Sequence, residues 1–479
     1  MSPRSDDARK TNFERIAKDR PRWKARNAAY YADDIAYMRF LVREGARILD
    51  LGCGDGDLLA ALAPGEGIGV DFSPAMLAVA RARHPDLTFL EADLEDTAAL
   101  IDVLKDKGPF DYIILSDTLG YLNDCQALLE ALHDLMGPDS RIVCSYYSAL
   151  WEPVLALGER LGLKMPQPEV NYLGFQDIAN LLFLADHDAI RNEFRQLIPY
   201  RLLGLGTLVN RFLGTLPVLR RLCLRHHMVA RSLRRRERRN PSASVLVPCR
   251  NEAGNIEAIV QRTPRFAEVM EIVFVEGNSS DNTYEECLRV KEAYKDSWDI
   301  TVVKQPGKGK GDAMRTAYAA AKHEVLMILD ADMTMPPEEL PKYYAVIAEG
   351  KGEFVNGTRL VYPMEQGAMR FLNYWANRSF ALIFSFLLNQ RFTDTLCGTK
   401  VFTRKAYDRI SEGRAYFGDF DPFGDFDLIF GAAKQNLKIV EVPIRYADRT
   451  YGSTQINRFR DGWLLLKMVV FAWRKLKAF

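Results

Sequence analysis

Two successive series of strand-like apolar runs, each alternating with helical segments, constrain the fold of this chain more than any other feature. The first series covers 47–52, 68–73, 87–93, 111–117, 141–147 and 189–198. The second covers 244–249, 271–277, 300–305, 325–332 and 354–360. Strands joined by single helices form right-handed crossovers in parallel sheets. The sequence therefore predicts two α/β domains with one sheet each, and the run at 189–198 is expected at a sheet edge.

A basic break separates the two series. Nine arginines and one glutamate lie between residues 220 and 239, and Asn240-Pro241-Ser242 follows them. The length of 479 residues, with 48% hydrophobic and 27% charged residues, is typical of a folded chain with more than one core. We expect a first domain over 1–200, an apolar and arginine-rich linker over 201–242, a second domain over 243–455 and an amphipathic helix over 456–479.

The cysteines and the apolar runs indicate a cytoplasmic protein without a spanning helix. The seven cysteines are scattered and include no C-x-x-C pair, as expected of free thiols in a reducing compartment. The start, MSPRSDDARK, lacks the apolar stretch of a secretory signal. The longest charge-free run, 379–390, has twelve residues, whereas a spanning helix needs about twenty.

A glycine-rich loop follows the first strand and reads Asp-Leu-Gly-Cys-Gly-Asp-Gly over 50–56. Glycines let the backbone turn sharply and approach a ligand beside a helix N-terminus. Asp71, nineteen residues after Gly52, ends the second strand, where a carboxylate can accept hydrogen bonds from both ribose hydroxyls. A dinucleotide site would carry its third glycine at position 57. The residue there is Asp57, which would repel a pyrophosphate.

This D-x-G-x-G-x-G loop, with Asp71 and with Asp93 after the third strand, resembles the class I S-adenosylmethionine methyltransferases over about residues 40–200. The resemblance implies a Rossmann-like sheet and S-adenosylmethionine as cofactor, with the glycines along the methionine moiety, Asp71 at the ribose and Asp93 at the adenine amine. The cofactor-binding residues expected here are Asp50, Gly52, Gly54, Gly56, Asp71, Asp93 and Asp117.

The methyl acceptor and the catalytic base stay open at this point. Asp117, Tyr121, His133 and Tyr146 lie at or beyond the carboxyl ends of predicted strands, where such sheets bind ligands. Each can take a proton during O-methylation. We interpret His133 as a residue on a helix surface.

Polar motifs follow the strands of the second series in a fixed order. A strand breaks into the polar loop 248–252, an acidic stretch over 276–283 follows the next strand, and Gly-Lys-Gly-Lys-Gly-Asp over 307–312 can close over phosphates. The last of these lacks the Walker arrangement. Leu-Asp-Ala-Asp over 329–332 then places two carboxylates at a strand end, where they can bind a hard divalent cation that neutralises a departing nucleotide diphosphate.

This ordered set, with the later motifs at 393–400 and 448–454, resembles glycosyltransferase family 2, and within it the dolichol-phosphate-mannose synthase-like branch, over about residues 243–460. The resemblance implies a GT-A-like sheet and inverting transfer from a nucleotide sugar with Mg²⁺ or Mn²⁺. It implies that the nucleotide sugar is bound by Pro248, Glu252, Glu276, Asp281, Lys310, Asp330, Arg359 and Arg449, and the metal by Asp330 and Asp332. Arg359 and Arg449 would contact phosphates. Gln455 departs from the branch, which carries lysine there.

Chemistry separates two acceptor classes for the sugar. A hydroxyl needs a base to take its proton, and Asp394 and Asp427 are the candidates. A lipid phosphate is already ionised and needs mainly positioning and charge screening. The Q-x-x-R-W signature of processive polysaccharide synthases is absent, which favours a polyprenyl phosphate.

Three segments favour peripheral binding to the inner face of the cell membrane. Residues 368–389 are apolar, the tail repeats Arg460, Lys467 and Arg474 every seven residues among apolar side chains, and the arginine run can meet anionic lipids. The alternative is that the apolar segments pack together or against a second subunit, and that the arginine run is a solvated linker.

The hypothesis is therefore a bifunctional transferase of glycan assembly that methylates one acceptor and loads a sugar onto a polyprenyl phosphate. One alternative is sugar transfer to a saccharide or small-molecule hydroxyl. Another is a membrane scaffold with one non-catalytic domain. A third, a nucleic-acid methyltransferase that uses the arginine run, would bind in a salt-dependent way and leaves the second domain unexplained. With a net charge of +1 we expect no nucleic-acid partner.

Overall fold

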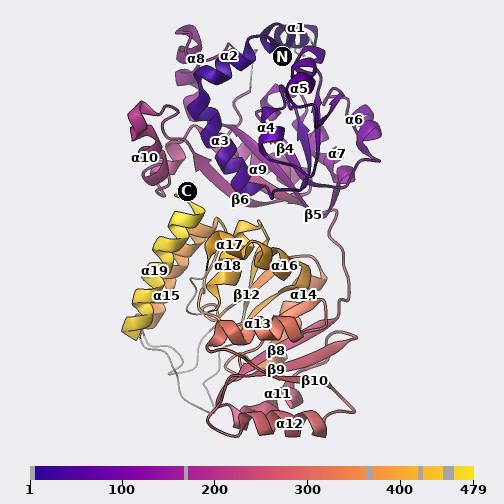
Figure 1. Ribbon diagram of the computed structural model, residues 1–479, viewed down its shortest axis with the longest axis vertical. Helices are drawn as coiled ribbons and strands as arrows, with labels where there is room; N and C mark the ends of the chain where they lie inside the picture. The colour runs from indigo at the N-terminus through magenta and orange to yellow at the C-terminus, as the bar shows by residue number, and fades with distance from the viewer. Residues whose placement is uncertain (1–5, 167–170, 363–370, 419–423, 446–457, 479) are drawn as a thin grey trace. The chain divides into compact units, whose positions relative to one another are not determined.

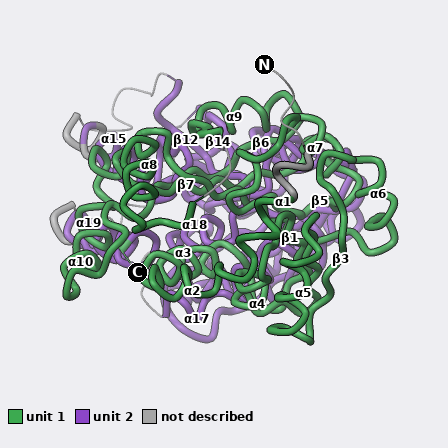
Figure 2. Tube along the Cα trace, turned by 90° about the horizontal axis from the view of Figure 1, so that it is seen from above, with its two compact units in different colours: residues 1–236, 478 green, residues 237–477, 479 purple. Residues whose placement is uncertain are grey.

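The computed structural model describes residues 6–166, 171–362, 371–418, 424–445 and 458–478, and the chain forms two compact units (Figure 1). The first unit comprises residues 1–236 with residue 478, and the second comprises 237–477 with 479, as coloured in Figure 2. Each unit contains a mixed seven-stranded sheet. The expected pair of α/β domains is therefore confirmed.

The sheet of the first unit has the order β3-β2-β1-β4-β5-β7-β6. Its strands are β1 Arg47–Leu51, β2 Glu66–Asp71, β3 Thr88–Glu91, β4 Phe110–Ser116, β5 Met136–Tyr147, β6 His187–Arg195 and β7 Arg225–Ser232. Strands β1 to β5 are parallel, with Leu49 beside Ile68 on one side and Ile113 on the other. β6 lies at the edge, as predicted.

Helices precede this sheet and connect its strands. They are α1 Asp6–Ala17, α2 Arg20–Arg26, α3 Ala28–Leu41, α4 Asp57–Ala61, α5 Pro74–Arg83, α6 Thr97–Leu104, α7 Cys125–Ala131, α8 Glu152–Arg160, α9 Phe175–Leu184 and α10 Leu205–Phe212. Side-chain caps start several of them: Ser73, Asp96 and Asp124 accept from backbone N–H groups that the first helical turn leaves unpaired. At the start of α4 the N-cap residue is instead Gly56, whose backbone is in a left-handed conformation.

Strand β7 corrects the expected linker. Residues 225–232 are buried along their whole length and pair antiparallel with both β5 and β6. The arginine run is therefore not a solvated linker throughout, because Arg225 and Arg231 lie inside the first unit. Buried arginines require partners, and carboxylates from distant segments provide them, which the local sequence does not reveal.

The sheet of the second unit has the order β10-β9-β8-β11-β13-β12-β14. Its strands are β8 Ala243–Cys249, β9 Met270–Glu276, β10 Asp299–Lys304, β11 Val325–Ile328, β12 Phe354–Thr358, β13 Lys400–Thr403 and β14 Ile439–Pro443. β13 is antiparallel to both neighbours, and the other pairs are parallel. The alternation predicted five of these strands and missed β13 and β14.

The helices of the second unit are α11 Ile256–Arg262, α12 Thr283–Ala293, α13 Lys310–Ala320, α14 Leu340–Ala348, α15 Phe371–Leu388, α16 Arg404–Glu412, α17 Arg414–Phe417, α18 Phe426–Lys434 and α19 Arg458–Leu476. The two apolar segments, α15 and α19, pack side by side (Figure 1). Their outer faces nevertheless expose Trp375 and Leu382 on α15 and Trp463 on α19. Among the residues that the structure describes, no helix is long and apolar enough to span a bilayer.

Candidate active sites

The glycine loop of the first unit needs glycine for two physical reasons. Gly52, Gly54 and Gly56 have φ angles of 78°, 55° and 73°, in the left-handed region that side chains disfavour. A Cβ atom on Gly52 would also lie 2.6 Å from Oγ1 of Thr118, which donates to the carbonyl of Leu51. The loop is therefore held close to the end of β4 and leaves its backbone open to a ligand.

Asp71 closes the other side of the loop. Its carboxylate accepts hydrogen bonds from the backbone N–H of Gly54 at 2.9 Å and of Ser73 at 2.9 Å. Burial raises its pKa, and these donors oppose that effect. Behind it, burial and then the charge of Asp71 raise the pKa of Asp50 to about 7. Asp50 thus lies in the core under the loop, whereas Asp71 borders the ligand side.

A cavity opens in front of this loop. Of the cofactor-binding residues expected from the sequence, Gly52, Gly54, Asp71, Asp93 and Asp117 line it, together with the candidate base Tyr121. The remaining walls include Phe13, Tyr31, Phe72, Met76, Tyr147 and Met165. The structure therefore brings most of the predicted residues together and adds aromatic walls that the sequence did not indicate.

Two other candidate bases lie elsewhere. His133 is buried, stacks on His187 and contacts Oγ of Ser232 and the carbonyl of Ala185, both at 2.7 Å. The interpretation of His133 as a helix-surface residue was wrong, since β7 and the end of α9 cover it. Tyr146 donates its hydroxyl proton to the carbonyl of Asn171.

The N-terminal helices add a basic side chain to the cavity. The Arg20 guanidinium of α2 lies against Gly54, where a Cβ atom would be 3.3 Å from its Nη2. Its Nε is buried without a hydrogen-bond partner and lies 3.7 Å from Asp55. Lys24, on the same helix, donates hydrogen bonds to Asp55 and Asp57. A buried donor aimed at an open glycine loop fits the carboxylate of S-adenosylmethionine.

Replacing Arg20 with glutamine is expected to weaken S-adenosylmethionine binding at least about tenfold, because a charge-assisted hydrogen bond to a carboxylate contributes roughly 1.5–3 kcal/mol. Titration calorimetry with S-adenosylhomocysteine measures the affinity. Arg26→Gln is the matched control, since Arg26 lies on the same helix and donates to the carbonyl of Gly162. Equal affinity for Arg20→Gln and wild type would contradict the assignment.

A buried ionic network supports the far wall of this cavity. Arg225 is fully buried and forms two hydrogen bonds of 3.2 Å with Asp34, one of 2.7 Å with Ser145 and a short one with Asp117. His227 lies 2.9 Å from the same Asp34 carboxylate. Burial acts to raise the pKa of Asp34, but Arg225 and His227 outweigh it and lower the pKa. Asp117 is thus fixed in place by an arginine from β7.

The polar loops of the second unit meet at the carboxyl ends of β8 and β9. Cys249 and Glu276 are paired in the sheet, so the loops after them are neighbours. The N–H of Glu252 donates to Thr283 at 3.0 Å, and Glu276 accepts from the N–H of Ser279. Asp281 accepts from Thr283, and its second oxygen is buried without a hydrogen-bond partner. The structure therefore brings these predicted nucleotide-sugar residues to one sheet edge, beside the partly exposed Pro248 of β8.

The two carboxylates of the Asp-Ala-Asp motif follow β11 at the same edge. Lys310, from the 307–312 loop, places its Nζ 2.9 Å from Asp330 and 3.8 Å from Asp425. Burial opposes the charged form of Lys310, yet the two carboxylates raise its pKa above the ordinary value. Asp332 accepts hydrogen bonds from the N–H and hydroxyl of Thr334 at 3.1 and 2.8 Å. The Lys310 ammonium thus lies beside both Asp330 and Asp425, at the strand end where the sequence predicts a divalent cation.

Because Gly398 has no side chain, it leaves space for the ion pair between Asp330 and Lys310. A Cβ atom there would lie 1.9 Å from Oδ2 of Asp330 and 2.8 Å from Nζ of Lys310. Behind it, the fully buried Lys400 donates to the carbonyl of Cys397 at 2.6 Å and lies 3.5 Å from Asp425. Lys400 and Asp425 are site residues that sequence reasoning missed.

The two candidate bases of the sugar-transfer site are engaged in ion pairs. Asp394 is fully buried and accepts hydrogen bonds from Nε and Nη2 of Arg359 at 2.6 and 2.8 Å, and from Asn377 at 3.1 Å. Burial acts to raise the pKa of Asp394, but Arg359 outweighs it and lowers the pKa. Asp427 pairs with Arg414 at 2.5 Å. Arg359, expected on a phosphate, thus binds Asp394, while Arg449 lies outside the described residues.

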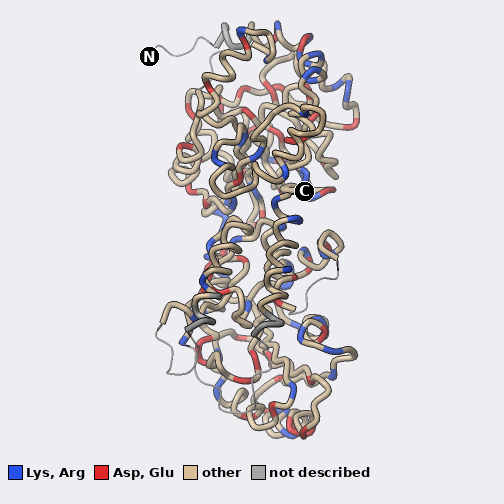
Figure 3. The backbone as a smooth tube through the Cα atoms, turned by 90° about the vertical axis from the view of Figure 1, so that its left-hand side faces the viewer, with Lys and Arg blue, Asp and Glu red and all other residues tan. Residues whose placement is uncertain are grey.

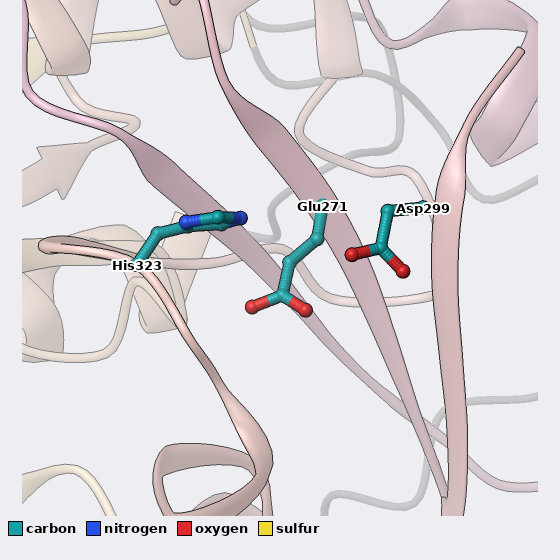
Figure 4. Close-up of side chains that lie close together, drawn as sticks. All are labelled: Glu271, Asp299 and His323. Carbon is teal, nitrogen blue, oxygen red and sulfur yellow. The ribbon is translucent and has the colours of Figure 1, made fainter.

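A second acidic cluster lies at the opposite ends of the strands. Glu271, Asp299 and His323 bring potential metal-ligand atoms within 4.8 Å of one another, with Glu271 between the other two (Figure 4). However, Nζ of Lys322 lies 2.9 Å from Asp299 and 3.6 Å from Glu271, and Glu271 also accepts from Ser244 at 2.6 Å. These contacts neutralise the carboxylates, so we interpret the cluster as an ion-paired brace of the sheet.

The chain matches two family patterns, one in each half. The pattern described as "Methyltransferase domain" matches residues 23–196, and the pattern described as "Glycosyl transferase family 2" matches residues 244–411. The chain is similar to Glycosyltransferase AglJ of Haloferax volcanii, with 31% identity over 225 residues, which are 46% of this chain and 68% of the relative. The Dolichyl-phosphate hexose transferase of the same organism is 30% identical over 202 residues, 42% of this chain and 79% of the relative.

The chain belongs to glycosyl transferase family 2. It carries a methyltransferase domain in addition, which implies S-adenosylmethionine as the methyl donor. The expected combination of two transferase activities is therefore confirmed. The chain spans about half (52%) of a third relative, the Low-salt glycan biosynthesis hexosyltransferase Agl6 of Haloferax volcanii, at 28% identity.

Solved structures resemble each half of this family 2 enzyme. A possible histamine N-methyltransferase from Thermotoga maritima has a TM-score of 0.36 and 16% identity, covering 46% of this chain and 96% of its own. Glucosyl-3-phosphoglycerate synthase of Mycobacterium tuberculosis has a TM-score of 0.36 and 17% identity, covering 49% of this chain and 80% of its own.

Proposed function

We propose that the second unit transfers a sugar from a nucleotide sugar to a polyprenyl phosphate at the membrane surface, with inversion, and that the first unit methylates a component of the same glycan assembly. The observation that carries this proposal is the ion pair between Asp394 and Arg359. With both candidate bases held by arginines, the site suits an acceptor that is ionised before it binds. A phosphate acceptor meets that requirement, and a sugar hydroxyl does not.

The named relatives support the same acceptor class. One relative that is 30% identical is called a dolichyl-phosphate hexose transferase, and the match covers 79% of its length. Exposed aromatic and aliphatic residues on α15 and α19, including Trp375, Leu382 and Trp463, support contact with a bilayer, which we place at the inner face of the cell membrane. Among its described residues the chain offers no spanning helix, so we infer peripheral binding.

Most of the predicted side chains have a place in the proposed reaction. Glu252, Glu276 and Asp281 bind the nucleoside of the donor, and Lys310 meets its pyrophosphate. Asp330 and Asp332 would hold Mg²⁺ or Mn²⁺, which supplies positive charge for the departing nucleotide diphosphate. Lys310, whose Nζ lies 2.9 Å from Asp330, would be close enough to such a site to pair with the pyrophosphate. Arg359 forms an ion pair with Asp394, and we place this pair in the wall of the site that receives the acceptor.

The deciding experiment measures release of nucleotide diphosphate by the purified full-length protein. UDP- and GDP-sugars are offered singly with Mg²⁺ or Mn²⁺, with and without polyprenyl phosphate in detergent. We expect one sugar to turn over only when the lipid phosphate is present. Turnover with a saccharide and not with the lipid phosphate would overturn the acceptor assignment and establish the hydroxyl acceptor instead.

The methyltransferase step is tested on the product of that reaction. Methyl-labelled S-adenosylmethionine is added after sugar transfer, and label in the lipid-linked product is expected. Label transferred equally without sugar transfer would separate the two activities into different pathways.

A further inference from the structure

Helix α8 of the first unit carries an unpartnered apolar stripe. Val154 and Leu157 on the helix, and Leu150 and Leu161 just beyond its ends, are more than half exposed. Their spacing of four, three and four residues places them on one helical face. The opposite face is covered, because Leu155 packs with Tyr30, Tyr147 and Leu224. The outer stripe is thus available to a partner.

The lobe formed by residues 200–222, which contains α10, is more exposed still. Six of its apolar side chains are more than half exposed: Leu202, Leu203, Leu205, Leu208, Val218 and Leu222. Residues 196–222 include four arginines and no aspartate or glutamate. Arg201, Arg211 and Arg221 are exposed. Figure 3 shows the distribution of Lys and Arg (blue) and of Asp and Glu (red) along the backbone. Leucines with basic residues and without acidic ones are typical of a helix that lies in a lipid interface.

The α8 stripe and the lobe are neighbours, and the segments on either side of α8 reach the methyl-donor cavity. Nε1 of Trp151, at the start of α8, donates to the carbonyl of Leu222 at 2.8 Å. Tyr147 and Met165, which flank α8 in the sequence, both line the cavity. We call the α8 stripe and the lobe together the docking face.

We infer that the docking face binds a bilayer that contains anionic lipids, so that the methyltransferase unit attaches to the membrane through its own surface. Charge decides between this occupant and a second copy of the chain. A twofold contact of lobe on lobe offers the exposed Arg201, Arg211 and Arg221 no acidic partner, because residues 196–222 contain no aspartate or glutamate. An anionic bilayer offers headgroup phosphates to the arginines and hydrocarbon to the leucines. The inference extends the proposed membrane association, which rests on α15 and α19, to the first unit.

The test compares vesicle binding by the full-length protein and by variants of the lobe. Vesicles consist of phosphatidylcholine alone or of an equimolar mixture with phosphatidylglycerol, and flotation gives the partition coefficient. Leu203→Asp with Leu208→Asp is expected to lower binding to the mixed vesicles at least about tenfold. The matched control is Val103→Asp, at an exposed apolar position of α6 in the same unit, and it should bind as wild type. Arg201→Gln with Arg221→Gln should weaken binding to the mixed vesicles only.

Two further measurements keep the outcomes distinct. Calorimetry with S-adenosylhomocysteine confirms that each variant of the first unit is folded, and light scattering gives its oligomeric state. Undiminished vesicle binding by the folded leucine variant overturns the inference, and so does a change of oligomeric state without loss of vesicle binding. If Trp463→Asp alone removes binding, the membrane part of the proposed function stands and the docking face fails. The assay contains no sugar donor, so its result is independent of the proposed sugar transfer.

Discussion

Alanine at Asp332 is expected to lower sugar transfer roughly a thousandfold, because a metal at this strand end contributes about 4 kcal/mol of transition-state stabilisation. The carboxylate follows β11 beside Asp330, at the edge where the nucleotide-sugar residues meet. Release of nucleotide diphosphate under saturating metal and donor measures the loss. S-adenosylhomocysteine affinity should be unchanged, since the first unit has its own core and its own cavity.

The matched control for this experiment is Asp299→Ala. Asp299 belongs to the cluster at the opposite ends of the strands, where Lys322 already pairs with it. If the carboxylates of that cluster are only a brace, the control retains near-normal transfer. A large loss with Asp299→Ala and a small one with Asp332→Ala would move the metal site to the Glu271 cluster and reject the assignment at Asp330 and Asp332.

Methionine at Arg225 is expected to destabilise the first unit by roughly 3–5 kcal/mol, because it leaves two carboxylates without their buried partner. Asp34 and Asp117 both hydrogen-bond to this guanidinium, which is fully buried. Denaturation of a two-unit chain is not two-state, so the measurement is hydrogen exchange of peptides from β5 and β6, which reports opening of this sheet alone.

Arg234→Met provides the comparison for that experiment. Arg234 pairs with Asp186 at 2.8 Å, but both side chains are about half exposed, and such pairs contribute roughly 0–1 kcal/mol. Adding Asp34→Asn to the Arg225→Met variant should recover part of the lost stability, because it removes one of the uncompensated buried charges. Exchange in β5 and β6 that is as slow in Arg225→Met as in wild type would show that the network contributes nothing.

The parts of both sites that local sequence patterns encode could be predicted. Positive φ angles at Gly52, Gly54 and Gly56 require glycine, and a carboxylate at the end of β2 follows from the alternation of strands and helices. The same holds for the two aspartates after β11. In each case the functional group lies within a few residues of a strand end, so its position follows once the strand is recognised.

Interactions between distant residues could not be predicted. Arg225, His226 and His227 begin a buried strand, yet three consecutive polar residues do not resemble one, and their partner Asp34 is about 190 residues away. Lys400 starts the missed strand β13 for the same reason. Asp394 and Arg359 were each interpreted as functional alone, whereas their pairing changes the interpretation of both. Burial of a charge is a property of the fold, and its sequence signal is dispersed over all its partners.

The position of β7 in the sheet has a consequence for the order in which this protein can fold during synthesis. β6 is complete at residue 195, but β7, its strand partner in the described sheet, is not made until thirty residues later. Until then β6 lacks backbone partners, and Asp34 and Asp117 lack their guanidinium. A ribosome that has finished residue 200 has therefore produced an unfinished methyltransferase, and the first enzyme can close its sheet only after the exposed leucine lobe has emerged.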